Sequence, residues 1–269
     1  MKNKLLLQLI MTLISISLFA QKDKIYSNYI IQYELNYIAN LKSRLQKSEK
    51  ILLLIGSGFS LCESFNKRYN DSVEQYYKRS SLNEKEAYGS IMSNRKRTGI
   101  KYKILKKNDS VFYTERFILD DYIYGEKLNF DWKISEEKKK IGIYNCQKAI
   151  STFGGRNFIA WFTKDIPISE GPYKFKGLPG LIVNIKDDRD HYIFNMLSIK
   201  RSKLEMNFNL KNAIEISKKK YYQNLEDYRE NFVQHMIQNG VQFRSEEQKK
   251  IWKERGRNFK TNELELKAN

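Results

Sequence analysis

The residues that could carry chemistry by their type are few in this 269-residue chain, and they are widely spaced. Its two histidines, His191 and His235, have no second metal ligand at short spacing, and the HExxH pattern of zinc hydrolases is absent. The GxSxG turn that carries a nucleophilic serine is absent too, and Gly56-Ser57-Gly58 lacks the third glycine of a dinucleotide-binding loop. The sequence therefore predicts no catalytic residue, no metal site and no cofactor, and it favours a protein that is not an enzyme.

The two cysteines, Cys62 and Cys146, leave several interpretations open. In an oxidising compartment they allow one intramolecular disulfide. Each could equally be a small buried hydrophobic residue on a strand. Lys148 would share a strand face with Cys146, so a thiolate activated by a neighbouring cation is a third interpretation. A packed cysteine beside a surface amine explains that pair equally well.

Residues 1–20 have the features of a signal peptide. Lys2 and Lys4 precede an apolar stretch over residues 5–20, and Phe19-Ala20-Gln21 suits cleavage before Gln21. The apolar stretch is shorter than the roughly 20 residues that cross a bilayer. We therefore expect an exported protein, periplasmic, outer-membrane-associated or secreted, with no transmembrane segment after cleavage.

The formal net charge of +18 at pH 7 is spread along the chain. Such a balance suits nucleic acid, an anionic membrane or a solvated cationic surface. Export argues against nucleic acid, and the basic residues are not grouped into blocks with aromatic residues. The charge therefore indicates a solvated cationic surface.

The spacing of apolar residues predicts an α+β fold. Residues 28–38 alternate apolar and polar side chains, as a half-buried strand does. Further strands are predicted at residues 51–55, 59–61, 102–105, 111–114, 117–124, 130–134, 141–152, 157–163, 180–185 and 192–199. Helical spacing follows over residues 221–236, where Gly240 ends the helix, and Ser245 opens a basic helix. We expect one domain over residues 21–269 with a large, curved antiparallel sheet, helices packed on one face, and a helical C-terminal part at 211–256.

All three prolines, Pro167, Pro172 and Pro179, lie close together among several glycines. Proline fixes φ and glycine admits positive φ, so this segment is predicted to be a loop of defined shape. Leu178-Pro179-Gly180 fits a type II turn with Pro179 second and Gly180 third. The apolar run over residues 181–183 predicts that this turn leads into a buried strand.

The same segment carries a resemblance to a known family. The residues that match are Ile143-Tyr144-Asn145-Cys146-Gln147-Lys148-Ala149, Phe153-Gly154-Gly155-Arg156, Ala160-Trp161-Phe162-Thr163, Ile166-Pro167, Gly171-Pro172 and Gly177-Leu178-Pro179-Gly180-Leu181-Ile182. They resemble the GLPGLI family, exported proteins of Gram-negative bacteria that are named for that hexapeptide. The usual family ending, a proline before Ile-Glu-Leu, stands here as Asn262-Glu263-Leu264-Glu265-Leu266 without the proline.

The resemblance places the core motif region at residues 141–199 and implies no activity. The candidate binding or motif residues that it singles out are Arg156, Trp161, Pro172, Gly177, Leu178, Pro179, Gly180, Leu181 and Ile182.

Three functions remain open at this level. In the first, the curved sheet binds an apolar ligand or lipid in a cavity lined by residues 158–162 and 181–183. In the second, the GLPGLI loop docks on an envelope protein. A hydrolase is the third. The hexapeptide could also be a rigid corner between two core strands with no binding role.

Export gives the first testable prediction. N-terminal sequencing of the protein from its native cell envelope should begin at or near Gln21, because the signal peptidase removes the apolar stretch. Mature protein that still begins at Met1 would contradict the compartment.

Overall fold

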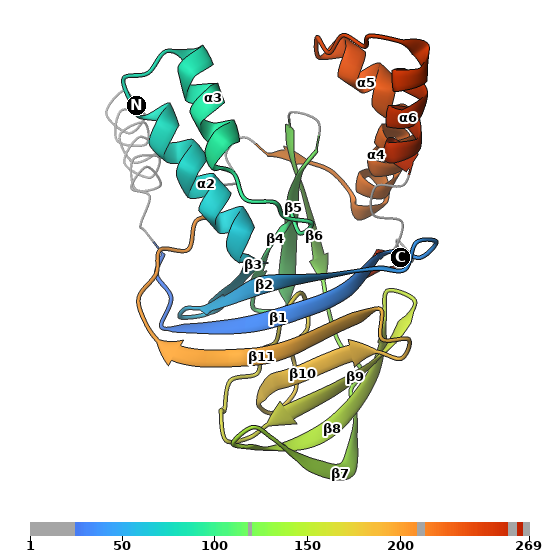
Figure 1. Ribbon diagram of the computed structural model, residues 1–269. Helices are drawn as coiled ribbons and strands as arrows, with labels where there is room; N and C mark the ends of the chain where they lie inside the picture. Colours follow the sequence, from blue (N-terminus) through green and yellow to red (C-terminus); the bar gives the residue numbers. More distant parts are fainter. Residues whose placement is uncertain (1–24, 118–119, 209–212, 258–262, 266–269) are drawn as a thin grey trace, which may run out of the picture.

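The computed structural model describes residues 25–117, 120–208, 213–257 and 263–265 (Figure 1). The predicted signal peptide lies outside these residues. Twelve strands form one sheet in the order β12-β6-β5-β4-β3-β2-β1-β11-β10-β9-β8-β7. Their bounds are β1 Tyr29–Asn40, β2 Leu45–Ile55, β3 Phe59–Ser64, β4 Lys103–Lys107, β5 Ser110–Phe117, β6 Asp120–Lys127, β7 Lys133–Ile141, β8 Tyr144–Phe153, β9 Arg156–Thr163, β10 Leu181–Asp187, β11 Tyr192–Arg201 and β12 Ile214–Glu215. Neighbouring strands are antiparallel except for β12 and β6.

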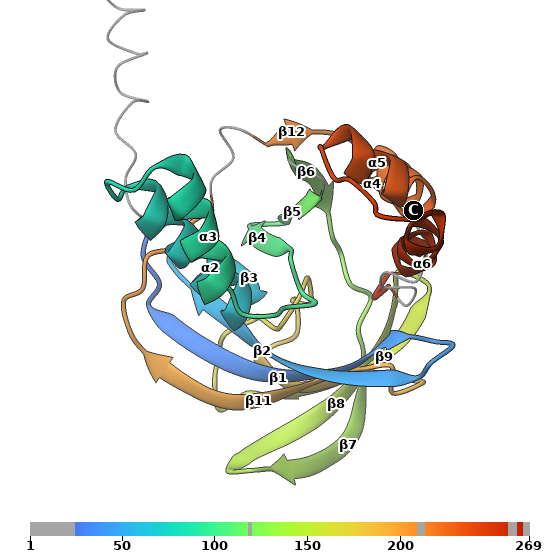
Figure 2. The same ribbon diagram turned by 45° about the horizontal axis from the view of Figure 1, so that its top comes forward.

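Strand β1 lies near the middle of the sheet, between β2 and β11. Its side chains at Ile31, Tyr33 and Leu35 are fully buried, while the polar residues between them are half-buried. This is the alternation that the sequence predicts for residues 28–38. The sheet curves strongly around its concave side (Figure 2), and the main hydrophobic core lies there.

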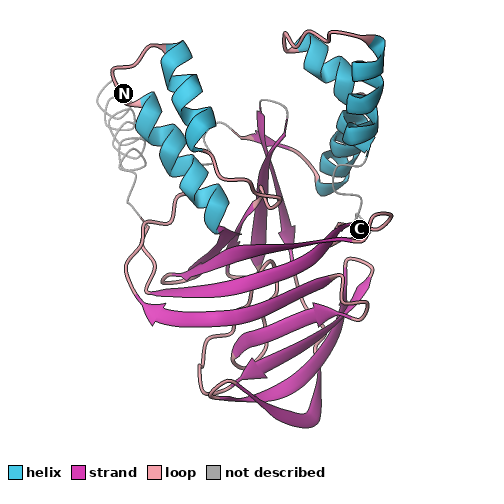
Figure 3. Ribbon diagram, in the orientation of Figure 1, coloured by secondary structure: helices cyan, strands magenta, loops and turns pink. Residues whose placement is uncertain are grey.

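Two groups of helices flank strands β4–β6 (Figure 3). The first contains α2 (Phe65–Lys78) and α3 (Glu84–Asn94), and the second contains α4 (Lys218–Glu230), α5 (Phe232–Gln238) and α6 (Glu246–Arg257). Ser64 caps α2 by accepting from two backbone N–H groups, and Asn83 forms a capping box with Glu86 in α3. The predicted α+β class is confirmed. None of the described helices is long and apolar enough to cross a membrane.

Several predicted elements differ in detail from the structure. The strand expected over residues 117–124 spans the end of β5 and the start of β6, with residues 118–119 outside the described part, and only residues 133–134 of the strand expected over 130–134 lie in β7. The helix expected over residues 221–236 is two helices, because Asn231 leaves the helical conformation at φ −100° and ψ 20°. Its side chain amide donates to Asp227, which supports this break. The strand expected over residues 141–152 is interrupted by a turn at Gly142, whose φ of +57° separates β7 from β8.

Residues 164–180, the internal loop, connect β9 to β10 and contain all three prolines. The loop packs across the sheet rather than away from it. Tyr173 N–H donates to Cys62 Sγ of β3 at 3.1 Å, and just after the loop the Tyr33 hydroxyl of β1 donates to the Ile182 carbonyl of β10 at 2.7 Å. Gly171 to Phe175 are buried without exception. The internal loop therefore has a defined shape and fills part of the core.

The turn into β10 is tighter than the predicted type II turn. Gly180 N–H donates to the Leu178 carbonyl at 2.8 Å, which makes a three-residue turn around Pro179. Gly180 has a φ of +153°, away from the value of about +80° that type II requires. Its backbone lies so close to β9 that an added Cβ would meet the Thr163 carbonyl oxygen at 2.0 Å.

That close approach gives the second prediction. Gly180→Ala should lower the free energy of unfolding well beyond the roughly 1–2 kcal/mol of left-handed strain, because backbone atoms of β9 must move. Gly58→Ala is the matched control, since Gly58 also has positive φ (+80°) but nothing lies within 4 Å of its added Cβ. Urea unfolding measures both. Equal losses in the two variants would show that the contact with Thr163 has no energetic role.

Candidate functional site

Two lysines are fully buried on the concave side of the sheet. Lys106 of β4 is 1% exposed and donates to the Gly171 carbonyl at 2.7 Å and the Phe175 carbonyl at 3.2 Å. It also pairs with Glu170 at 2.5 Å. Every one of these partners belongs to the internal loop, so one ammonium group ties the loop to β4. Buried charges persist only when they are paired and hydrogen-bonded in this way.

The second buried lysine, Lys174, lies on the internal loop and is 0% exposed. Its ammonium group donates to the Tyr124 hydroxyl at 3.1 Å and pairs with Glu126 of β6 and with Glu265 at 2.5 Å. Four aromatic rings lie within about 6 Å of the ammonium group, those of Tyr113, Tyr124, Phe153 and Tyr173.

Glu265 reaches this group from the C-terminal segment, residues 263–265. Its carboxylate accepts from the Tyr173 hydroxyl and pairs with Lys218 of α4 at 2.7 Å as well as with Lys174. Burial alone would raise the pKa of Glu265, but the ion pairs with Lys174 and Lys218 outweigh it, so its pKa lies below the usual value. The carboxylate therefore stays ionised inside the protein.

Arg156, a candidate of the sequence motif, holds the same C-terminal segment from the other side. It pairs with Asp187 of β10 at 2.7 Å and donates to the Glu263 carbonyl at 2.6 Å. His191 Nδ1 lies 3.2 Å from its guanidinium group. Arg156 thus joins β9, β10 and residues 263–265, which we call the tail.

The remaining motif residues are mostly in the core. Leu178, Leu181 and Ile182 belong to the main hydrophobic cluster, and Pro172 is buried with the internal loop. Trp161 packs in a separate cluster with Cys146 and Val183, and Lys139 lies over its ring. Of the hexapeptide, only Gly177 and Pro179 are exposed. The structure brings these residues together as packing and forms no open site from them.

Both cysteines are free and buried, so the possible disulfide between Cys62 and Cys146 is not formed. They lie on β3 and β8, with five strands between them, and six steps of about 4.8 Å far exceed the roughly 7 Å that a disulfide allows. Burial raises the pKa of Cys62 to about 11 and also raises that of Cys146. Lys148 pairs with Glu137 at 2.6 Å, so the structure does not support an activated thiolate.

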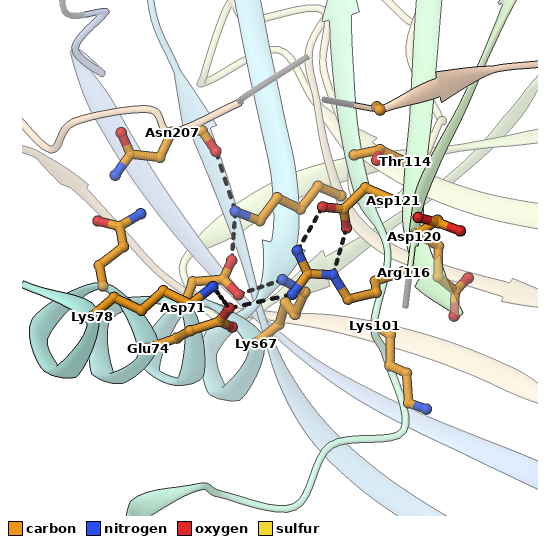
Figure 4. A pocket seen from close by; sticks show the side chains of 14 residues that line it. Lys67, Asp71, Glu74, Lys78, Lys101, Thr114, Arg116, Asp120, Asp121 and Asn207 are labelled. Carbon is orange, nitrogen blue, oxygen red and sulfur yellow. Dashed lines mark hydrogen bonds and ion pairs between the residues drawn. The ribbon is translucent and has the colours of Figure 1, made fainter. Parts of the chain in front are cut away.

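A cleft of about 480 Å³ lies between α2 and strands β4–β6 (Figure 4). Its ten charged lining residues are five basic and five acidic: Lys67, Lys78, Lys101, Lys103, Arg116, Asp71, Glu74, Glu115, Asp120 and Asp121. Many of them pair with each other. Asp71 pairs with Lys103 at 2.7 Å, and Arg116 pairs with Asp121 at 2.7 Å and Glu74 at 3.3 Å. Burial opposes the shift, but Lys103 and Lys67 lower the pKa of Asp71, and Lys78, followed by Arg116, lowers the pKa of Glu74, which makes both carboxylates charge partners and poor general acids.

A smaller recess of about 180 Å³ lies between α4 and strand β1. Its less polar wall consists of Tyr37, Ala39, Gly99, Leu225 and Tyr228. Its charged groups are four basic and two acidic: Lys47, Lys101, Arg116, Arg229, Glu115 and Glu263. The recess therefore combines an apolar wall with four basic residues, of which Arg229 pairs with Glu263 and Arg116 pairs with Asp121 and Glu74 outside the recess.

Beneath the recess, the interior is filled by tyrosine side chains. They are Tyr102, Tyr113, Tyr124, Tyr173, Tyr192 and Tyr221, all buried, and burial is the main cause that raises the pKa of each. They act as neutral hydroxyl groups and not as phenolates. The space left among them and the tail is about 10 Å³, hardly room for a water molecule. In the described part of the chain, no group of three His, Cys, Asp or Glu side chains could hold a metal ion.

Sequence reasoning missed Lys106, Lys174, Lys218 and Glu265. One signal was present: Lys174 stands between Tyr173 and Phe175 inside the Pro/Gly segment, where a solvated lysine is unexpected. The other three gave none, since a lysine or glutamate looks the same in sequence whether it is buried or exposed.

The fold and this interior define an α+β protein with an open, curved sheet. Residues 152–184, which contain β9 and the whole internal loop, match the model of a family described as "Protein of unknown function (Porph_ging)". No curated protein matches the chain. The structure of PNGF-II in a C2 space group is similar, with a TM-score of 0.52, 16% identity, and coverage of 75% of this chain and 33% of that chain.

A second PNGF-II structure, in a P21 space group, has a TM-score of 0.51 at 15% identity and covers 76% of this chain and 34% of that one. Identities this low show a shared fold alone. This chain spans about a third of the length of PNGF-II.

The lowered pKa of Glu265 gives the third prediction. The Glu265 carboxyl group stabilises the folded protein because its pKa is lower in the folded state than the unfolded value of about 4.3. This contribution is complete at pH values above the unfolded pKa, and it is lost as the pH falls through the folded-state pKa. Glu265→Gln should therefore unfold more easily at pH 7, by up to about 3 kcal/mol, and should lose less stability than the parent between pH 5 and pH 3. Urea titrations at several pH values measure this. Glu136→Gln, on the exposed part of β7, is the control. A parallel pH dependence in the parent and Glu265→Gln would rule out this role.

Proposed function

We propose that the protein is an exported, non-enzymatic binding protein of the GLPGLI type, and that it holds a small amphipathic anion in the recess between α4 and β1. The observation that carries this proposal is the combination in one recess of an apolar wall with four basic and two acidic residues. An anionic group would meet the basic rim while the apolar part of the ligand contacts Tyr37, Leu225 and Tyr228.

The volume of the recess limits what it can take. About 180 Å³ lies below the roughly 300–1,000 Å³ of pockets that enclose a whole drug-sized ligand. The recess suits one aromatic ring or the end of an alkyl chain, such as part of a lipid. A larger apolar cavity along residues 158–162 and 181–183 has no support, because Phe158, Phe162 and Leu181 are packed in the core.

The larger cleft is less suited to such a ligand. Its basic and acidic side chains are equal in number, whereas the recess has four basic and two acidic residues, and a ligand in the cleft would have to break several ion pairs at 2.5–3.3 Å between its central groups. Docking through the hexapeptide receives less support than ligand binding, since only Gly177 and Pro179 are exposed.

The fourth prediction tests the recess with octanoate as the probe and octanamide as its neutral analogue. We expect calorimetry to show saturable binding of octanoate and at least several-fold weaker binding of octanamide, because the rim favours an anion. Tyr228→Ala removes apolar wall and should weaken octanoate binding at least fivefold, while Lys47→Gln should weaken it a few-fold.

Lys133→Gln is the matched charge control, since Lys133 is exposed on β7 and does not line the recess. Octanoate binding that is unchanged in Tyr228→Ala and Lys47→Gln would place the ligand elsewhere. The absence of any octanoate binding would overturn the proposal for this ligand class.

A further inference from the structure

The C-terminal segment is held inside the protein the way a bound ligand is held. Leu264 is 5% exposed and Glu265 is 2% exposed, although both lie beyond α6 in the sequence. Leu264 belongs to the main hydrophobic cluster. The segment has no strand pairing, so side chains of other elements provide its specific contacts.

Most of these contacts are made by cationic side chains, which bind the two ends of this three-residue segment. Lys174 and Lys218 bind the Glu265 carboxylate at 2.5 and 2.7 Å, and the Tyr173 hydroxyl donates to it. At the other end of the segment, Arg229 pairs with the Glu263 carboxylate and Arg156 donates to the Glu263 carbonyl.

An apolar surface lies between the two charged ends of this site. The space around the tail is lined by Ile100, Leu225 and six tyrosines, Tyr102, Tyr113, Tyr173, Tyr192, Tyr221 and Tyr222. A ligand with two carboxylates on either side of an aliphatic residue matches this arrangement. The site selects for a carboxylate at this position because Lys174 is buried. An uncharged side chain in place of Glu265 would remove one of the two carboxylate partners of Lys174.

We propose that Lys174, Lys218, Tyr173, Arg156 and Arg229 form a recognition site for an acidic peptide of the pattern Glu-aliphatic-Glu, and that residues 263–265 are its built-in occupant. A partner protein with such a segment would bind by displacing the tail. The tail raises the partner concentration that is needed for this exchange, because a tethered occupant competes at a high effective concentration, of about millimolar order. This site adjoins the octanoate recess, with which it shares Leu225, Arg229 and Glu263, whereas Lys174, Lys218, Tyr173 and Arg156 do not line the recess.

A fluorescent peptide with the sequence of residues 262–266, Asn-Glu-Leu-Glu-Leu, tests the site by anisotropy. The receptors are the full chain and its Glu265→Gln variant, in which the tail is a weaker competitor. We expect the peptide to bind the variant at least tenfold more tightly than the parent. Replacing the second glutamate of the peptide by glutamine should weaken binding to the variant at least tenfold. Adding Lys218→Gln to the variant should do the same, and adding Lys133→Gln should not.

If Glu265→Gln does not fold, Glu263→Gln serves as the receptor. It loosens the tail at the partly exposed Glu263, keeps Arg229 of the proposed site in place and leaves the buried Lys174 pairs intact. A folded receptor that fails to bind the peptide, or that binds it equally well with glutamine in place of the second glutamate, overturns the proposal. Loss of octanoate binding with retention of peptide binding would instead remove only the proposed function of the recess.

Discussion

The interior depends on one constraint: two lysine ammonium groups lie where water cannot reach them. Leaving such a charge without partners costs several kcal/mol, a large fraction of the stability of a domain. Lys106 meets the constraint with two carbonyl groups of the internal loop and the Glu170 carboxylate. These carbonyl groups point at one ammonium group because the loop turns sharply at Tyr173, whose φ is +54°. The buried position of Lys106 therefore requires this shape of the internal loop.

The internal loop, held in this shape, helps to fill the concave side of the sheet. A concave antiparallel sheet of this size could enclose a lipid cavity, but the internal loop and the buried tyrosines occupy the concave side. On this side of the sheet, the cleft and the recess described above lie at the rim, where α2 and α4 meet the strands. Fold resemblance to other curved sheets therefore says little about what this one binds.

The fold was largely predictable from the sequence, because alternation of apolar residues is a local signal. The pattern at Ile31, Tyr33 and Leu35 identified β1, and the Pro/Gly segment identified a shaped loop. The break at Asn231 was not predictable, since the apolar spacing continues across it and a local hydrogen bond to Asp227 decides the outcome. The turn at Gly180 was misread because Pro-Gly also fits a type II turn, and the contact with Thr163 is not local.

The candidate site was predictable only where it coincides with the motif. Arg156 was identified through the resemblance, but its partners Asp187 and Glu263 could not be derived, as they are brought to it by different parts of the chain. The disulfide between Cys62 and Cys146 was left open because cysteine count carries no information on strand order. A lysine such as Lys106 is expected at the protein surface from its residue type, so its burial could not be predicted from the sequence.

The charges of the interior connect the internal loop to the tail. Lys174 and Lys218 share two carboxylates, Glu126 of β6 and Glu265 of the tail. Without the tail, two buried or nearly buried ammonium groups would share Glu126 alone, and their mutual repulsion would act in a medium of low dielectric. An acidic residue at position 265 is thus required by a lysine in a loop far away in sequence. The polar contacts that hold residues 263–265 go to the Glu263 and Glu265 carboxylates and to the Glu263 carbonyl.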